Sequence, residues 1–124
     1  MPKILLAEGE MDLRWSLRYA LVRNKFDVVE VNSGDLVLNQ CQKEKPDLIV
    51  LDAHMPRLSG MEVLQALKAG AETKAVPVVY MTLSNEKKLV EQALARGAKE
   101  ILPKTGFSVM KLIYSVRKAL ENGS

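Results

Sequence analysis

The sequence has little of several residue types that define classes of protein. It contains one cysteine, Cys41, and one histidine, His54, which excludes an internal disulfide and zinc sites built from several such ligands. No apolar run approaches the roughly 18 residues of a membrane-spanning helix, and the apolar segment between Lys3 and Glu8 is too short for a secretory signal. We therefore expect a cytoplasmic protein, with Cys41 as an ordinary helix residue.

Composition and charge indicate a single folded domain. Hydrophobic residues make up 48% of the 124 residues and charged residues 27%, which is typical of globular rather than disordered chains of one-domain length. The net charge is +3, but the basic residues are dispersed and do not form the stripe typical of nucleic-acid-binding proteins. We expect one domain over residues 1–122, no direct nucleic-acid binding, and a tail at 123–124, for which a cloning remnant is one explanation.

Short apolar runs alternate with segments of helical periodicity along the chain. The runs are typical of parallel strands buried on both faces, and the segments between them place apolar residues three and four positions apart. This alternation implies right-handed crossovers, and therefore a doubly wound α/β fold with a five-stranded parallel sheet and helices on both faces. The expected strands are 4–7, 28–31, 48–51, 76–81 and 101–102; the expected helices lie around 13–21, 36–41, 63–67, 89–94 and 109–120, with capping residues at 32–35, 59–60 and 84–86 before the second, third and fourth.

A polar residue follows each of four predicted strands: Glu8, Asp52, Thr82 and Lys104. Ligands of doubly wound sheets bind at the carboxyl ends of the strands, so we expect these side chains to converge. Two carboxylates about 4 Å apart repel by roughly 4 kcal/mol at an effective dielectric near 20, so the cluster needs Lys104 or a hard cation such as Mg²⁺. Each residue alone has an ordinary explanation as a turn, strand or solvated residue, but together they predict a site for a doubly charged anion.

The motifs around these residues resemble the receiver domain of two-component response regulators. The most specific segment is KPDLIVLD at 45–52, followed by Met55-Pro56 and Ser59-Gly60. The resemblance runs from residue 3 to about residue 121. Its other parts are KILLAE at 3–8, VPV at 76–78 leading to Thr82, and Gly97-Ala98 leading to Lys104.

The resemblance implies a flavodoxin-like fold and a role for each site residue. Asp52 would accept a phosphoryl group from a phosphohistidine on a partner kinase, Thr82 would be the switch hydroxyl, and Lys104 would pair with a phosphoryl oxygen. The implied ligands of Mg²⁺ are Glu8, Asp52 and the backbone carbonyl of His54, with Glu10 available only if its loop bends back.

The same resemblance implies a signalling role for the whole domain. The chain would be a phosphoryl acceptor rather than an enzyme, although it could hydrolyse its own acyl phosphate. Phosphorylation would shift the face formed by the fourth helix, fifth strand and fifth helix, and that face would contact a downstream output protein or a fused effector domain.

Four positions depart from the family pattern. Gly9 replaces the second acid of an acidic pair, Leu83 replaces a small residue, Ile101 replaces an aromatic switch residue, and Thr105 replaces a proline whose cis peptide is intrinsically accessible. These departures leave two functions open: a receiver phosphorylated at Asp52 with weak or absent Mg²⁺ binding, and a pseudo-receiver that acts through phosphorylation-independent protein contacts.

We favour the phosphorylated receiver over the other functions. The acceptor and the charge-stabilising groups that phosphoryl transfer needs are present. The glycines match neither a dinucleotide fingerprint nor a Walker loop, and flavin binding is supported by topology alone. We interpret His54 as a loop residue, with acid or base catalysis as its alternative role.

The first predicted helix carries apolar residues on its outer side. Met11, Trp15 and Val22 lie opposite the predicted core stripe, with Tyr19 nearby. Because tryptophan is enriched in binding hot spots, we expect a partner or homodimer patch centred on Trp15. The alternative is that Trp15 packs flat along its neighbours.

Overall fold

The computed structural model describes residues 1–83, 86–105 and 108–121, and in these residues five strands alternate with five α-helices and one short 3₁₀ helix. The predicted cap at Ser84-Asn85 and the predicted tail at 123–124 lie outside the described residues. The elements are β1 (Lys3–Ala7), α1 (Met11–Arg23), β2 (Asp27–Val31), η1 (Gly34–Leu36), α2 (Val37–Glu44), β3 (Leu48–Asp52), α3 (Gly60–Ala69), β4 (Val78–Thr82), α4 (Lys87–Ala95), β5 (Glu100–Pro103) and α5 (Val109–Glu121).

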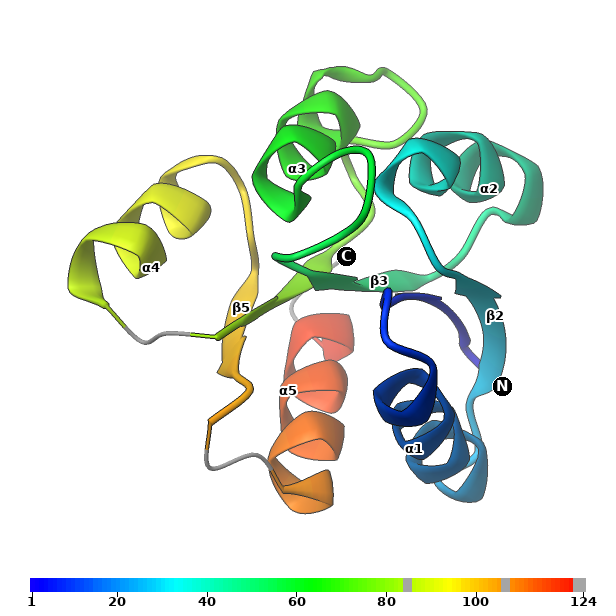
Figure 1. Ribbon diagram of the computed structural model, residues 1–124. Coiled ribbons are helices and arrows are strands. Elements are labelled where there is room, and N and C mark those ends of the chain that lie inside the picture. Colours follow the sequence, from blue (N-terminus) through cyan, green and yellow to red (C-terminus); the bar gives the residue numbers. More distant parts are fainter. Residues whose placement is uncertain (84–85, 106–107, 122–124) are drawn as a thin grey trace.

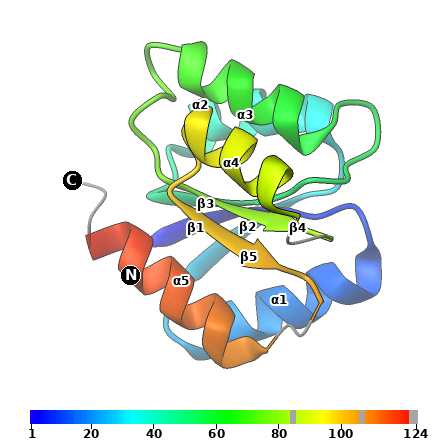
Figure 2. The same cartoon turned by 90° about the vertical axis from the view of Figure 1, so that its left-hand side faces the viewer.

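The strands form one parallel sheet in the order β2-β1-β3-β4-β5. Helices α1 and α5 cover one face, and α2, α3 and α4 cover the other (Figure 1, Figure 2). The strand order reverses direction between β1 and β3, and the carboxyl ends of these neighbouring strands are where a doubly wound sheet binds ligands. The predicted flavodoxin-like, doubly wound fold is confirmed.

The core has two parts, one on each face of the sheet. One gathers side chains of α1 and α5, such as Leu17 and Leu112, against the sheet, and the other gathers side chains of α2 and α3, such as Cys41 and Leu64. Every residue of β3 is buried. Burial on both faces explains why the strands are continuous apolar runs rather than alternating patterns.

Helix α3 starts close to the end of β3. Ser59 and Glu62 form a capping box, in which the Ser59 hydroxyl accepts from the Glu62 amide and the Glu62 carboxylate accepts from the Ser59 amide. A Cβ on Gly60 would lie 2.5 Å from the Asp52 carbonyl oxygen and 2.6 Å from the Ala53 Cα. Glycine at this position therefore allows the helix to pack against the strand end that carries Asp52.

Each strand differs from its predicted range by one or two residues at one or both ends, and the second helix also starts differently. Strand β4 begins at Val78 rather than Val76, because Pro77 has no N–H to donate to the sheet, and Thr82 is its last residue rather than the first residue after it. The second helix opens with η1, and the Ser33 hydroxyl donates to the Asp35 carboxylate (2.6 Å) instead of capping a backbone amide. Within the described residues, no helix has the length and hydropathy to cross a membrane.

Candidate functional site

Glu8 directly follows β1 and is held by its backbone and its side chain. Its N–H donates to the Val31 carbonyl (3.2 Å), its carbonyl accepts from Nη1 of Arg14 (3.0 Å), and its Oε2 accepts from the Glu10 N–H (3.0 Å). Glu8 is only 1% exposed. The end of β1 therefore presents a buried carboxylate in one fixed position.

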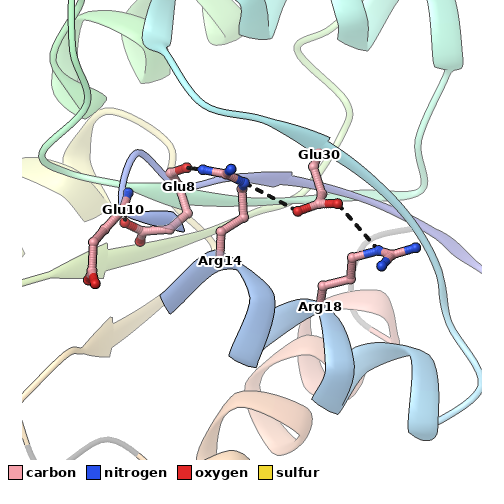
Figure 3. A network of polar contacts seen from close by, with 5 residues as sticks. All are labelled: Glu8, Glu10, Arg14, Arg18 and Glu30. Carbon is pink, nitrogen blue, oxygen red and sulfur yellow. Dashed lines mark hydrogen bonds and ion pairs between the residues drawn. The ribbon is translucent and has the colours of Figure 1, made fainter. Parts of the chain in front are cut away.

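The guanidinium of Arg14 is itself oriented by a carboxylate on β2. Arg14 Nε lies 3.2 Å from Glu30 Oε1, and Arg18 Nε lies 3.3 Å from the other oxygen of Glu30. Figure 3 shows this chain of contacts running from Arg18 through Glu30 and Arg14 to the Glu8 carbonyl. Sequence reasoning missed the arrangement; the available signal was the single acid, Glu30, within an otherwise apolar run.

Asp52 is the last residue of β3 and is 1% exposed. Its Oδ1 accepts from Nζ of Lys104 (2.8 Å) and from the backbone N–H of His54 (3.1 Å). The His54 residue is exposed, so its side chain faces solvent rather than a buried pocket. Asp52 is therefore a buried carboxylate with one oxygen held by a cation and a backbone amide.

Lys104 joins the two carboxylates. Its Nζ lies 3.2 Å from Glu8 Oε1 and 2.8 Å from Asp52 Oδ1, and its side chain is 15% exposed. Apart from this ion pair, Glu8 Oε1 has no hydrogen-bond partner among the described residues. The predicted convergence of Glu8, Asp52 and Lys104 at one edge of the sheet is therefore observed.

Burial and pairing set the charges of this cluster. Burial raises the pKa of Glu8 and the nearby Asp52 carboxylate raises it further, although the Glu10 amide and Lys104 act in the opposite direction. Burial by itself lowers the pKa of Lys104, but its pairing with Asp52 and Glu8 outweighs burial, so this pKa lies above its ordinary value. Lys104 therefore stays cationic at neutral pH. Burial also raises the pKa of Tyr80, and the Asp52 carboxylate raises it further.

Thr82 lies beside the cluster, on β4. Its carbonyl accepts from the Lys104 N–H (2.7 Å), and its side chain is buried with no hydrogen-bond partner for Oγ1 among the described residues. A buried hydroxyl without a partner costs about 1–3 kcal/mol. Thr82 therefore has a buried hydroxyl whose hydrogen-bonding capacity is not used within the described residues.

A shallow depression of about 470 Å³ opens over these strand ends. Lys104 and the two buried carboxylates line it, while Thr82 is not among its lining residues. Leu83, the residue after Thr82, is 51% exposed. Thr105 follows Lys104 through a trans peptide bond, and Ile101 packs against the core as a partly buried residue. The remaining lining residues are Gly9, Glu10, Ala53, His54, Met55, Pro56 and Ser59.

The residues at this edge do not fit a divalent cation held by three carboxylates. Gly9 offers no side-chain ligand, and a Cβ there would lie 2.9 Å from Cδ of Pro56. Glu10 is exposed, and its carboxylate points away from that of Glu8 (Figure 3). In residues 1–83, 86–105 and 108–121, no three Asp, Glu, His or Cys side chains are placed to hold a metal. The ammonium of Lys104 instead lies between the two buried carboxylates.

The outer side of α1 is apolar and exposed, as expected. Trp15 is 58% exposed, and Met11 and Val22 are also exposed. Sequence reasoning missed the neighbouring exposed residues of α5, because the packing of α1 beside α5 is a tertiary feature (Figure 1). A hollow of about 630 Å³ between the two helices is lined by Trp15, Ser16, Tyr19, Ala20, Arg23, Asn24 and Val109.

Solved structures share this fold over nearly the whole chain. The receiver domain of Francisella response regulator 1452 has a TM-score of 0.91 at 23% identity, covering 100% of both chains. The chemotaxis response regulator CheY4 of Vibrio cholerae has a TM-score of 0.89 at 24% identity, covering 96% of this chain and 98% of that one. At this identity the likeness shows the fold alone.

Comparisons of sequence identify the family. The family model of the response regulator receiver domain matches residues 4–117. The phosphate regulon transcriptional regulatory protein PhoB of Rhizobium meliloti is 33% identical over 120 residues, which are 97% of this chain and 52% of that protein. The alkaline phosphatase synthesis transcriptional regulatory protein PhoP of Bacillus subtilis is 33% identical over 102 residues, which are 82% of this chain and 42% of that protein. The chain thus spans about half the length of these relatives, and it belongs to the receiver domain family of two-component response regulators.

Proposed function

We propose that Asp52 accepts a phosphoryl group and that residues 1–122 act as the receiver unit. The observation that carries the proposal is the ammonium of Lys104, which lies 2.8 Å from Asp52 and 3.2 Å from Glu8 at the edge of an open depression. Phosphoryl transfer needs alignment and charge stabilisation more than covalent chemistry from the protein. These three side chains supply a nucleophile and a fixed positive charge beside it.

The proposed step conserves atoms and electrons. A carboxylate oxygen of Asp52 attacks the phosphorus of a phosphohistidine on a partner histidine kinase, and the P–N bond breaks with its electron pair returning to the imidazole. Because Oδ1 is engaged by Lys104 and the His54 amide, attack falls to Oδ2. Lys104 stabilises the charge on the phosphoryl oxygens, and the unused hydroxyl of Thr82 donates to one of them.

The proposed output is a change of protein contacts. The acyl phosphate biases a two-state equilibrium through its contacts with Thr82 and Lys104, and the face formed by α4, β5 and α5 transmits the bias to an output protein or effector domain. The patch of Met11, Trp15 and Val22 on α1 serves as a second contact surface, for a partner or for a second copy. Hydrolysis of the acyl phosphate by water resets the domain.

Proteins of this family generally bind Mg²⁺, and we propose that this member binds it weakly or not at all. The support is the absence of a carboxylate at Gly9 and the exposure of Glu10. The same observation favours the second candidate function, a pseudo-receiver that signals by constitutive protein contacts. We rank it lower because Asp52, Thr82 and Lys104 retain the acceptor, the hydroxyl and the cation.

The experiment that tests the proposal is mass spectrometry of the intact protein after incubation with acetyl phosphate and Mg²⁺. We expect the mass to increase by one phosphoryl group, and Asp52→Asn to abolish the increase. Asp47→Asn is the matched control, because Asp47 lies before β3 and pairs with the Lys3 amide at the other end of the sheet. No mass gain with acetyl phosphate or a cognate kinase contradicts the proposal and leaves the pseudo-receiver. A gain that persists in Asp52→Asn also contradicts it, because the phosphoryl group then lies on another residue.

A further inference from the structure

The side chain of Arg14 bridges the acidic loop after β1 and the neighbouring strand β2. Its Nη1 donates to the Glu8 carbonyl (3.0 Å) while its Nε pairs with Glu30 (3.2 Å). The arginine is partly buried, with 14% of its side chain exposed. An arginine held at two points by different elements has a single orientation, which distinguishes it from a solvated surface charge.

Glu30 ties this arginine to a rigid part of the fold. It lies within β2, paired in register with Leu6 of β1, two residues before Glu8. Its second oxygen pairs with Arg18 (3.3 Å), so both of its oxygens are engaged. Figure 3 shows the Arg14 guanidinium between the Glu30 carboxylate and the Glu8 carbonyl.

The other contacts of the loop that Arg14 holds are the bond from the Glu8 amide to the Val31 carbonyl and the contacts of the Glu8 carboxylate. Gly9 has no side chain to fix it, and the Glu10 side chain is exposed. The carboxylate of Glu8 reaches both the Glu10 amide and Lys104, so the position of the Glu8 backbone decides how Lys104 is shared between the two carboxylates. If the backbone moves, Glu8 leaves Lys104 and the ammonium pairs with Asp52 alone.

We propose that Arg14 is a positioning residue for the site. By holding the Glu8 carbonyl it keeps the Glu8 carboxylate against Lys104, and this keeps the ammonium between Glu8 and the nucleophile Asp52. The effect of Arg14 on the rate of phosphorylation rests on the proposed function, whereas its effect on the loop does not. Arg14 touches no reacting atom, so the role is one of alignment.

Amide hydrogen exchange tests the effect on the loop. Arg14→Met keeps a long side chain but removes both contacts, and we expect the Glu8 and Glu10 amides to exchange about tenfold faster. The matched control is Arg18→Met, which removes the same charge from the same helix but reaches only Glu30, and which we expect to leave these amides unchanged. The Ile49 amide in β3, bonded to the Pro77 carbonyl, reports global opening and is expected to be unchanged in both variants.

A second pair of measurements separates alignment from stability. Under acetyl phosphate we expect Arg14→Met to gain its phosphoryl group about fivefold more slowly than wild type, and Arg18→Met to match wild type. If Arg14→Met does not fold, Arg14→Lys replaces it in these experiments. Lysine reaches one of the two acceptors but not both, so we expect the exchange rates of the loop amides to be intermediate.

The outcomes are distinguishable. Wild-type exchange in Arg14→Met, or equal acceleration at Ile49, overturns the positioning role, and so does unchanged phosphorylation in a variant whose loop exchanges faster. If the wild-type protein takes up no phosphoryl group at all, the proposed function fails, and the exchange of the Glu8 and Glu10 amides still decides whether Arg14 holds the loop.

Discussion

At the scale of single residues, one ammonium pairs with two buried acids. Glu8 and Asp52 are each 1% exposed, and Lys104 is paired with both. Removing one partner of a buried charge pair is costly because the remaining charge stays desolvated. A cation of the protein therefore already occupies the position between the two carboxylates, and this is the residue-scale reason to expect weak metal binding.

Gly9→Asp tests that expectation. Aspartate would add a carboxylate beside Glu8, and the Pro56 ring, 2.9 Å from the new Cβ, must shift to admit it. We expect the variant to bind Mg²⁺ at least about tenfold more tightly than wild type, because hard cations gain from each oxygen ligand. The measurement is broadening of amide NMR signals in a Mn²⁺ titration, with Mg²⁺ competition.

Gly9→Asn is the control for that variant, since it has the same shape without the charge. We expect it to bind Mg²⁺ like wild type. Equal affinity of wild type and Gly9→Asp would show that the missing carboxylate does not limit Mg²⁺ binding, and it would contradict the role assigned to Gly9.

At the scale of elements, the inner and outer sides of α1 have different roles. Its inner side packs Leu17 and Leu21 into the core, Arg14 contacts Glu8, and its outer side exposes Trp15. Exposed tryptophan near a hollow between two helices is typical of a contact surface rather than of a core. The next helix in space, α5, adds Tyr114, which is 66% exposed.

Trp15→Ala tests whether that outer side binds. Because Trp15 is exposed, we expect an unfolding midpoint close to that of wild type. We expect weaker self-association in sedimentation velocity, or at least about fivefold poorer phosphotransfer from a kinase. Gln65→Ala on α3, which trims an exposed side chain away from α1 and from the face of α4, β5 and α5, is the control. If Trp15→Ala changes neither oligomeric state nor phosphotransfer, Trp15 only packs along its neighbours.

At the scale of the whole molecule, the sheet topology is what brings the site together. Asp52 and Lys104 could be predicted from sequence as neighbours because each follows a buried run, and parallel strands end at one edge. Their exact contacts could be seen only in the structure. The same holds for the hydrogen bond from Arg14 to the Glu8 carbonyl, because contacts from a side chain of α1 to a loop and to β2 leave no periodic pattern in the sequence. The boundary of β4 also escaped prediction, since local apolar character does not show where sheet hydrogen bonding begins after Pro77.

The central claim is that Lys104 supports phosphoryl acceptance by Asp52. Its most direct test is the initial rate of acyl phosphate formation, followed by ³¹P NMR with acetyl phosphate, in wild type and in Lys104→Met, with Lys99→Met as a control of equal charge change. This role of Lys104 predicts formation at least about 100-fold slower in Lys104→Met and near the wild-type rate in Lys99→Met. Equal rates in wild type and Lys104→Met would contradict it.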